Sequence, residues 1–191
     1  MSDAAQLHTI FLVTGPVQGG KTSFLSELAE LLKKRGLTLG GFLCPGSFDS
    51  GQRSGFSLKN IGTGMKLAMA SDKETPEWFK YRRFWFNPLA FKEGKEWIQA
   101  CLRREPDVVV IDEVGPMELD GSGWSELLNK LVISPVPVHI WSVRENLLGE
   151  VMQRWDISSD HHIRIEKTEV SQAAELIARI VKTYRKSNHN Q

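Results

Sequence analysis

The amino-acid sequence predicts an α/β fold with a mostly parallel central sheet and helices on both faces. Short apolar runs rich in β-branched residues alternate along the chain with amphipathic segments of helical period, which is typical of parallel sheets. A glycine-rich loop joins the first apolar run to the first helix, and another apolar run, at 108–112, ends in a carboxylate. Because parallel strands end at the same edge of a sheet, we expect the residues that follow them to form one site.

Length and composition limit the class of protein. The 191 residues predict a single domain, 1–191, that can bury a substantial core. The 24 basic and 23 acidic residues nearly balance, so charge favours neither nucleic acid nor a membrane as a partner. No apolar run approaches the length of a membrane span, and Cys44 and Cys101 match no metal-binding spacing. We expect a cytoplasmic protein with reduced thiols; the composition does not reveal whether it has a protein partner.

The strongest motif lies at residues 10–23. An apolar strand is followed by a loop that fits G-x-x-x-x-G-K-[ST], the Walker A pattern, and then by leucines at helical spacing. Glycines let loop N–H groups approach phosphate oxygens, and the helix start adds further free N–H groups. Lys21 is expected to reach the β and γ phosphates, and the Thr22 hydroxyl is expected to reach Mg²⁺. The predicted nucleotide-binding residues are Gly15, Pro16, Val17, Gln18, Gly19, Gly20, Lys21, Thr22 and Ser23.

The second motif is the run VVVID at 108–112, which has the Walker B form. A buried strand would deliver Asp112 to the edge of the sheet beside the glycine-rich loop, where Asp112 and Thr22 would hold Mg²⁺. Glu113 follows directly and is the candidate base that polarises an attacking water, with Lys21 as the second catalytic residue. Alone, the two carboxylates could simply end a strand, but the Walker A segment favours the catalytic interpretation.

Phosphoryl chemistry also needs positive charge near the terminal phosphate. Arg53, in a glycine-flanked loop, and Arg144, at the end of the strand that follows the 108–112 strand in the chain, are the candidates. A solvated surface side chain is the alternative for each. Trp141 and Trp155 could stack on a base, but aromatic residues in such positions are more often part of the core.

The other elements follow from periodicity and turn residues. An antiparallel hairpin is expected near 53–70, inserted in the α/β chain. Residues 71–80 are interpreted as a connector, and 81–86 as one further strand. The aromatic segment 78–86 is expected to pack by one face on the core; a nucleic-acid surface is the alternative. Further strands are predicted at 38–44, 135–143 and 160–166, and further helices at 87–104, 124–132, 144–154 and 172–186. Asn87, followed by Pro88, is the expected N-cap of the helix at 87–104.

The run VVVIDEVGPMEL resembles the signature of the THEP-type nucleoside-triphosphatases, which are called cancer-related nucleoside triphosphatase in vertebrates. Segments 40–71, 79–94 and 136–155 are similar to further segments of that family in the same order, so the resemblance spans nearly the whole chain. The chain departs from the family pattern at Gln18-Gly19, Ser47-Phe48, Arg82-Arg83 and Arg144-Glu145-Asn146.

This resemblance implies a P-loop NTPase fold and slow, Mg²⁺-dependent hydrolysis of nucleoside triphosphates with little base selectivity. It assigns the phosphates and metal to the Walker A residues and metal ordering to Asp112. Glu113 is the implied base, and Glu118 matches a family glutamate without an evident role. The predicted reaction is hydrolysis of ATP or GTP to the diphosphate and phosphate. Two alternatives stay open: a kinase that phosphorylates a small molecule, and a nucleotide-dependent switch or delivery protein with slow hydrolysis.

Overall fold

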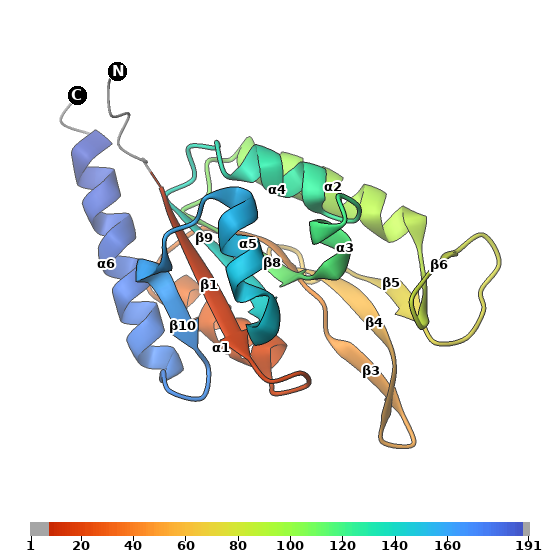
Figure 1. Cartoon of the computed structure of the whole chain (residues 1–191). Helices are drawn as coiled ribbons and strands as arrows, with labels where there is room; N and C mark the ends of the chain where they lie inside the picture. Colours follow the sequence, from red (N-terminus) through yellow and green to blue (C-terminus); the bar gives the residue numbers. More distant parts are fainter. Residues whose placement is uncertain (1–7, 189–191) are drawn as a thin grey trace.

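A computed structural model describes residues 8–188, in which ten strands form one mixed sheet with helices on both faces (Figure 1). The strand order is β10-β1-β9-β8-β2-β4-β5-β7-β6, and β3 pairs with β4. The strands are β1 Thr9–Gly15, β2 Leu39–Leu43, β3 Gly46–Asp49, β4 Gln52–Asn60, β5 Lys66–Ser71, β6 Phe79–Tyr81, β7 Phe84–Phe86, β8 Val108–Val114, β9 Val138–Arg144 and β10 His162–Arg164. The helices are α1 Lys21–Lys34, α2 Pro88–Leu102, α3 Pro116–Leu119, α4 Ser125–Leu131, α5 Leu148–Trp155 and α6 Val170–Asn188, with 3₁₀ turns η1 Glu145–Leu147 and η2 Ser159–His161.

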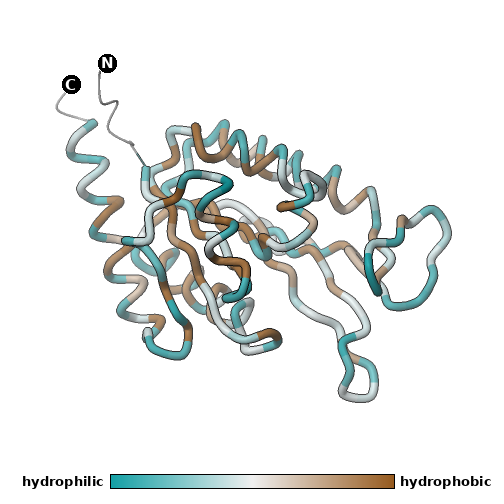
Figure 2. The backbone as a smooth tube through the Cα atoms, viewed as in Figure 1, coloured by the Kyte–Doolittle hydropathy of each residue, from teal (hydrophilic) through white to brown (hydrophobic). Residues whose placement is uncertain are grey.

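The parallel part of the sheet consists of β10, β1, β9, β8 and β2. Alternate side chains of these strands point to opposite faces, as the twofold strand period requires. Leu12, Ile111 and Trp141 join a core with α2, α4 and α5, whereas Phe11 and Val110 join a second core with α1 and α6. Figure 2 shows that apolar residues are concentrated in these strands and along parts of the helices. The predicted fold with helices on both faces is confirmed.

The antiparallel part is larger than the sequence indicated. The hairpin predicted near 53–70 is β4 and β5, which pair antiparallel, and β3, β7 and β6 extend the sheet on that side. The prediction of one strand at 81–86 is wrong. The chain turns at Arg82, which has φ 53°, so the segment is a hairpin of β6 and β7. The aromatic residues continue across this turn, and no glycine or proline marks it.

Close approach of β2 to β8 depends on a glycine. Gly41 has φ 107°, and a Cβ atom there would overlap the carbonyl oxygen of Val110 on β8. L-residues with side chains rarely adopt such a backbone conformation. The paired glycines at 40–41 therefore allow β2 to join the parallel strands beside the Walker B strand.

Several boundaries differ from the predicted ones. The segment predicted as a helix from Arg144 begins with the η1 turn and becomes α-helical at Leu148, and the short helix α3 after β8 was not predicted. Trp141 and Trp155 are both buried in the core, as expected.

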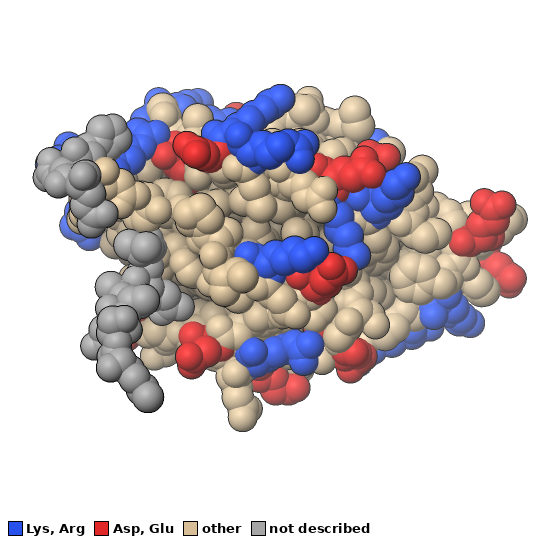
Figure 3. Space-filling model, turned by 90° about the horizontal axis from the view of Figure 1, so that it is seen from above, with Lys and Arg blue, Asp and Glu red and all other residues tan. Residues whose placement is uncertain are grey.

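Within residues 8–188, no helix is both long and apolar enough to cross a bilayer. Basic and acidic side chains are interspersed on the face seen in Figure 3.

Candidate active site

The Walker A loop connects β1 to α1 and is shaped by two residues with positive φ. β1 ends at Gly15, and the exposed loop turns with Gln18 at φ 60° and Gly20 at φ 92°. The Gly19 amide donates to the Pro16 carbonyl at 2.9 Å. Gly20 precedes α1 without a side-chain cap, so no protein side chain competes for the first N–H groups of the helix. Such a row of amides at a helix start is an anion-binding site.

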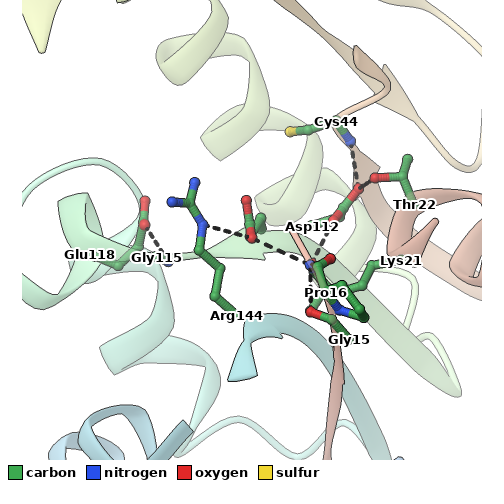
Figure 4. A network of polar contacts seen from close by, with 11 residues as sticks. Gly15, Pro16, Lys21, Thr22, Cys44, Asp112, Gly115, Glu118 and Arg144 are labelled. Atoms are coloured by element: carbon green, nitrogen blue, oxygen red, sulfur yellow. Dashed lines mark hydrogen bonds and ion pairs between the residues drawn. The ribbon is translucent and has the colours of Figure 1, made fainter. Parts of the chain in front are cut away.

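Lys21 is the first residue of α1 and lies buried under this loop. Its Nζ donates to the Gly15 carbonyl at 3.2 Å and to the Pro16 carbonyl at 3.0 Å (Figure 4). The same Nζ is 4.0 Å from Oε1 of Glu113. The backbone carbonyls therefore hold the ammonium group at the loop, and the Glu113 carboxylate is its longer ion-pair partner.

Asp112 is 2 % exposed and collects three donors from three different parts of the chain. Its Oδ2 accepts from Thr22 Oγ1 at 2.8 Å and from the Cys44 amide at 3.0 Å, and its Oδ1 accepts from Ser142 Oγ. Burial raises the pKa of the Cys44 thiol well above its ordinary value, so the nearby sulfur is a neutral thiol. Sequence reasoning missed Ser142, whose signal was a polar residue near the end of an otherwise apolar strand.

Glu113 and Arg144 form an ion pair at the carboxyl edge of the sheet, with Nε 3.2 Å from Oε1. Both side chains are partly exposed, at 25 % for Glu113 and 35 % for Arg144. The register of β8 against β9 shifts after Ile111, and the Asp112–Glu113 peptide bond is cis. Glu113 thus lies between two cations, Lys21 and Arg144, at the mouth of the loop.

Arg53, the other arginine candidate, comes from β4 in the antiparallel part. Its guanidinium lies over the rings of Phe48 and Phe56, at 5.4 and 5.0 Å from their centroids. Burial lowers its pKa, and its buried Nε has no hydrogen-bond partner among the described residues. Arg53 lines the same cavity as Glu113 and Arg144, so the structure brings both arginine candidates to one side of the site.

Glu118 holds the loop that follows the Walker B strand. It is 4 % exposed, and its carboxylate accepts from the amide of Gly115 at 2.9 Å and from that of Trp124 at 3.2 Å. Burial raises the pKa of Glu118 to about 7. The side chain does not contact the Walker residues directly; it ties the start of α3 to the start of α4 and so fixes the chain beside Glu113.

A glycine-rich phosphate cradle that faces a buried, strand-end aspartate defines a P-loop protein. The comparison with known families agrees: a family model described as "NTPase" matches residues 10–183. The chain belongs to this family, and the relatives below identify it as the THEP-type nucleoside-triphosphatase family.

Curated relatives from archaea carry the name "Nucleoside-triphosphatase THEP1". The protein from Methanopyrus kandleri is 30% identical over 131 residues, 68% of this chain and 70% of its own. The one from Thermofilum pendens is 32% identical over 157 residues, 77% and 82% of the two chains.

Two solved structures share the fold. The solution structure of a human cancer-related nucleoside triphosphatase has a TM-score of 0.65 at 20% identity, covering 94% of this chain and 98% of its own. The crystal structure of THEP1 from Aquifex aeolicus has a TM-score of 0.64 at 21% identity, covering 91% and 99%. At these identities the likeness concerns the fold.

Proposed function

We propose that the protein hydrolyses nucleoside triphosphates to the diphosphate and phosphate with the help of Mg²⁺. One observation carries the proposal: buried Asp112 accepts from Thr22 at the Walker A loop, one residue before Glu113, which lies 4.0 Å from Lys21. The motifs thus converge from β1, α1 and β8 on one edge of the sheet. The curated relatives named as nucleoside-triphosphatases support the same reaction.

The chemistry of the donor set fits Mg²⁺. The Thr22 hydroxyl oxygen and an Asp112 carboxylate oxygen lie 2.8 Å apart, and both are hard oxygen ligands of the kind that Mg²⁺ takes together with water and phosphate. Within residues 8–188 no group of three or more His, Cys, Asp or Glu side chains could hold a metal, so the protein would supply only part of the coordination. When bound, the ion would neutralise charge on the β and γ phosphates.

The protein's own groups account for the remaining steps. The loop amides and Lys21 would bind the phosphates, with Lys21 moving its donors from the Gly15 and Pro16 carbonyls to phosphate oxygens. Glu113 would accept a proton from water as the water oxygen bonds to the γ phosphorus. The bond from that phosphorus to the bridging oxygen breaks, and the diphosphate leaves. Arg144 would hold the Glu113 carboxylate and add positive charge.

Low base selectivity follows from which atoms are recognised. Backbone amides, an ammonium group and a hydroxyl all address the triphosphate, which ATP, GTP, CTP and UTP share. We therefore expect similar rates with all four nucleotides. The test is phosphate release from a panel of these nucleotides with Mg²⁺ and no added acceptor. Free phosphate without an acceptor supports hydrolysis, and its absence with every nucleotide would refute it.

A second candidate function, phosphoryl transfer to a small molecule, is favoured by the cavity next to Glu113, because a hydroxyl bound there could replace water. A hydrolase releases free phosphate at once, whereas a kinase mostly waits for its acceptor. The same nucleotide panel therefore separates the two: formation of the nucleoside diphosphate that stays slow until a small-molecule extract is added, without matching release of free phosphate, would favour the kinase.

A further inference from the structure

A cavity of about 430 Å³ opens beside the phosphate loop and is not accounted for by the Walker motifs. Residues Val17, Gln18 and Glu113 line it on the side of the loop. The opposite wall is aromatic and is built mainly by the antiparallel extension of the sheet with α2 and the start of α4. This aromatic wall consists of Phe56, Tyr81, Phe84, Phe86, Phe91 and Trp124.

The rings of the aromatic wall form a continuous chain of contacts. Phe56 meets Phe84 at 5.1 Å between centroids, Phe86 meets Phe91 at 6.0 Å, and Phe91 meets Trp124 at 4.8 Å. The rings contact one another edge to face or at a tilt, and together they form a wall on which a flat apolar group can pack. Pockets of this volume, with apolar walls and a few polar groups, are typical of small-molecule sites.

The polar groups of the cavity are mostly cationic. Four arginines line it, Arg53, Arg82, Arg83 and Arg144, against the carboxylates of Glu113 and Glu118. Glu118 is already engaged by two backbone amides, and Glu113 pairs with Arg144. Among residues 8–188, no carboxylate lies within ion-pair distance of the other three guanidinium groups. Arg83 is stacked on Phe84, with 4.5 Å from its Cζ to the ring centroid.

We propose that this cavity is a second binding site, for a small aromatic anion, and that its occupant displaces the water that attacks the terminal phosphate. The aromatic wall fits a flat apolar body, and the guanidinium groups without a carboxylate partner fit a sulfonate, phosphate or carboxylate. Of these, Arg83 uses one donor for the Arg53 carbonyl, at 2.7 Å, and keeps its other donors for a ligand. The effect on water follows from Glu113, which lines the cavity and is the proposed base. That second half of the proposal rests on the proposed hydrolysis; binding of the anion does not.

If Glu113 is the base, as proposed, the cavity that it lines lies on the side of the γ phosphate. Glu113 follows the metal-binding Asp112 at the end of β8, and the cavity extends from Glu113 toward β4, β7 and α2, away from β1 and β10. The purine or pyrimidine ring of a nucleotide bound at the loop would have to fold back over the phosphates of that nucleotide to reach the aromatic wall. The occupant is therefore a molecule separate from the nucleotide.

The probe is 8-anilinonaphthalene-1-sulfonate, a fluorescent aromatic anion, titrated into the full chain with a saturating non-hydrolysable ATP analogue and Mg²⁺. We expect one saturable site that the analogue does not displace. The double variant Arg82→Gln, Arg83→Gln should weaken binding about tenfold or more, since each guanidinium offers a charge-assisted contact. Phe84→Ala should also weaken it, whereas Arg179→Gln, an exposed arginine on α6, is the matched control and should not.

Phosphate release measured in the same samples tests the second half. The probe should slow release from ATP without raising the KM for ATP, and the arginine double variant should be resistant while keeping its rate without the probe. Displacement of the probe by the ATP analogue, or a raised KM in Phe84→Ala, would mean that the cavity holds the nucleotide base and would overturn the proposal. Binding that is equal in all folded variants would also overturn it. Circular dichroism checks that Phe84→Ala folds; the exposed arginines give an independent variant if it does not.

Discussion

Glu113 differs from Asp112 in its surroundings, although the two carboxylates are neighbours in the chain. Asp112 is buried and holds three donors, whereas Glu113 is a quarter exposed and has its carboxylate between Lys21 and Arg144. A buried carboxylate that accepts from three donors is suited to keep a fixed position, and an accessible one is suited to accept a proton from water. Environment therefore assigns different roles to adjacent residues of the same chemistry.

Replacing Glu113 with Gln should abolish most of the phosphate release while leaving nucleotide binding nearly unchanged. The amide keeps the shape but cannot accept the proton, and general-base catalysis contributes roughly 10²–10⁴-fold. The measurements are phosphate release for kcat and fluorescence titration with a labelled ATP analogue for Kd. Turnover at the parent rate would contradict the assignment of Glu113 as the base.

Glu118 should make stability depend on pH near neutrality. Burial raises its pKa to about 7, so the folded protein binds this proton more tightly than the unfolded chain does. The stabilisation that this tighter proton binding gives to the folded protein is complete below the ordinary pKa of 4.5. It is lost as the pH rises through about 7. Relative to Glu118→Gln, the free energy of unfolding of the parent should fall by on the order of 3 kcal/mol over that range.

Urea unfolding of both proteins between these pH values measures this difference. The quantity to compare is the change in the free energy of unfolding with pH, not its absolute value. The absolute values differ for another reason, because the single amide oxygen of Gln cannot replace the two oxygens with which Glu118 accepts from the Gly115 and Trp124 amides. Two parallel curves would show that Glu118 titrates normally in the folded protein.

At the scale of the elements, the site depends on how β2 joins β8. The amide of Cys44, which follows β2, donates to Asp112, so β2 helps to position the proposed metal-binding carboxylate. The pairing in turn requires Gly41, since a side chain there would overlap the backbone of β8. Gly41 lies outside the Walker motifs in the sequence, but through this pairing it affects the position of Asp112 and so the proposed hydrolysis.

Gly41→Ala should lower the free energy of unfolding by about 3 kcal/mol or more, because the new Cβ meets backbone that cannot move aside and φ is unfavourable for alanine. Gly149→Ala on α5 is the matched control: a Cβ there meets no atom within 4 Å, and alanine favours the helix, so stability should stay equal or rise by up to about 1 kcal/mol. Chemical denaturation of both variants is the measurement. Equal effects at the two positions would show that β2 can shift to accommodate a side chain.

At the scale of the whole molecule, the nucleotide should connect segments that the chain keeps far apart. The glycine-rich loop follows β1, Asp112 and Glu113, the proposed metal ligand and base, lie near the end of β8, and Arg144 ends β9. A ligand that contacts all of them stabilises the folded state over the unfolded chain by mass action.

A non-hydrolysable ATP analogue with Mg²⁺ at about 100 times its Kd should stabilise the fold by about 2.7 kcal/mol, or roughly 5–10 °C in Tm. Lys21→Met removes the charge that addresses the phosphates and should remove most of this shift. Its Tm without nucleotide should change little, because Lys21 donates to loop carbonyls, its ion pair with Glu113 is long at 4.0 Å, and Met can occupy the same buried space. Differential scanning fluorimetry measures both quantities, and an undiminished shift in Lys21→Met would place the nucleotide elsewhere.

Features that depend on local sequence pattern could be predicted without the structure. The Walker A loop, the apolar strand before Asp112 and the Asn87 cap of α2, which accepts from the Leu89 amide, all follow from neighbours in the chain. The β4–β5 hairpin was recognisable for the same reason. The β6–β7 hairpin was not, because its turn at Arg82 contains no residue type that marks a turn.

The order of the strands, and therefore the residues that contact Asp112 and Glu113, could not be predicted from the sequence. β9 is inserted between β1 and β8, so Ser142 reaches Asp112 and Arg144 reaches Glu113. Strand order depends on how crossover connections pack over the sheet, and residues distant in sequence leave no local pattern that reports it. The aromatic cavity likewise exists only because β4, β7 and α2 meet beside the phosphate loop.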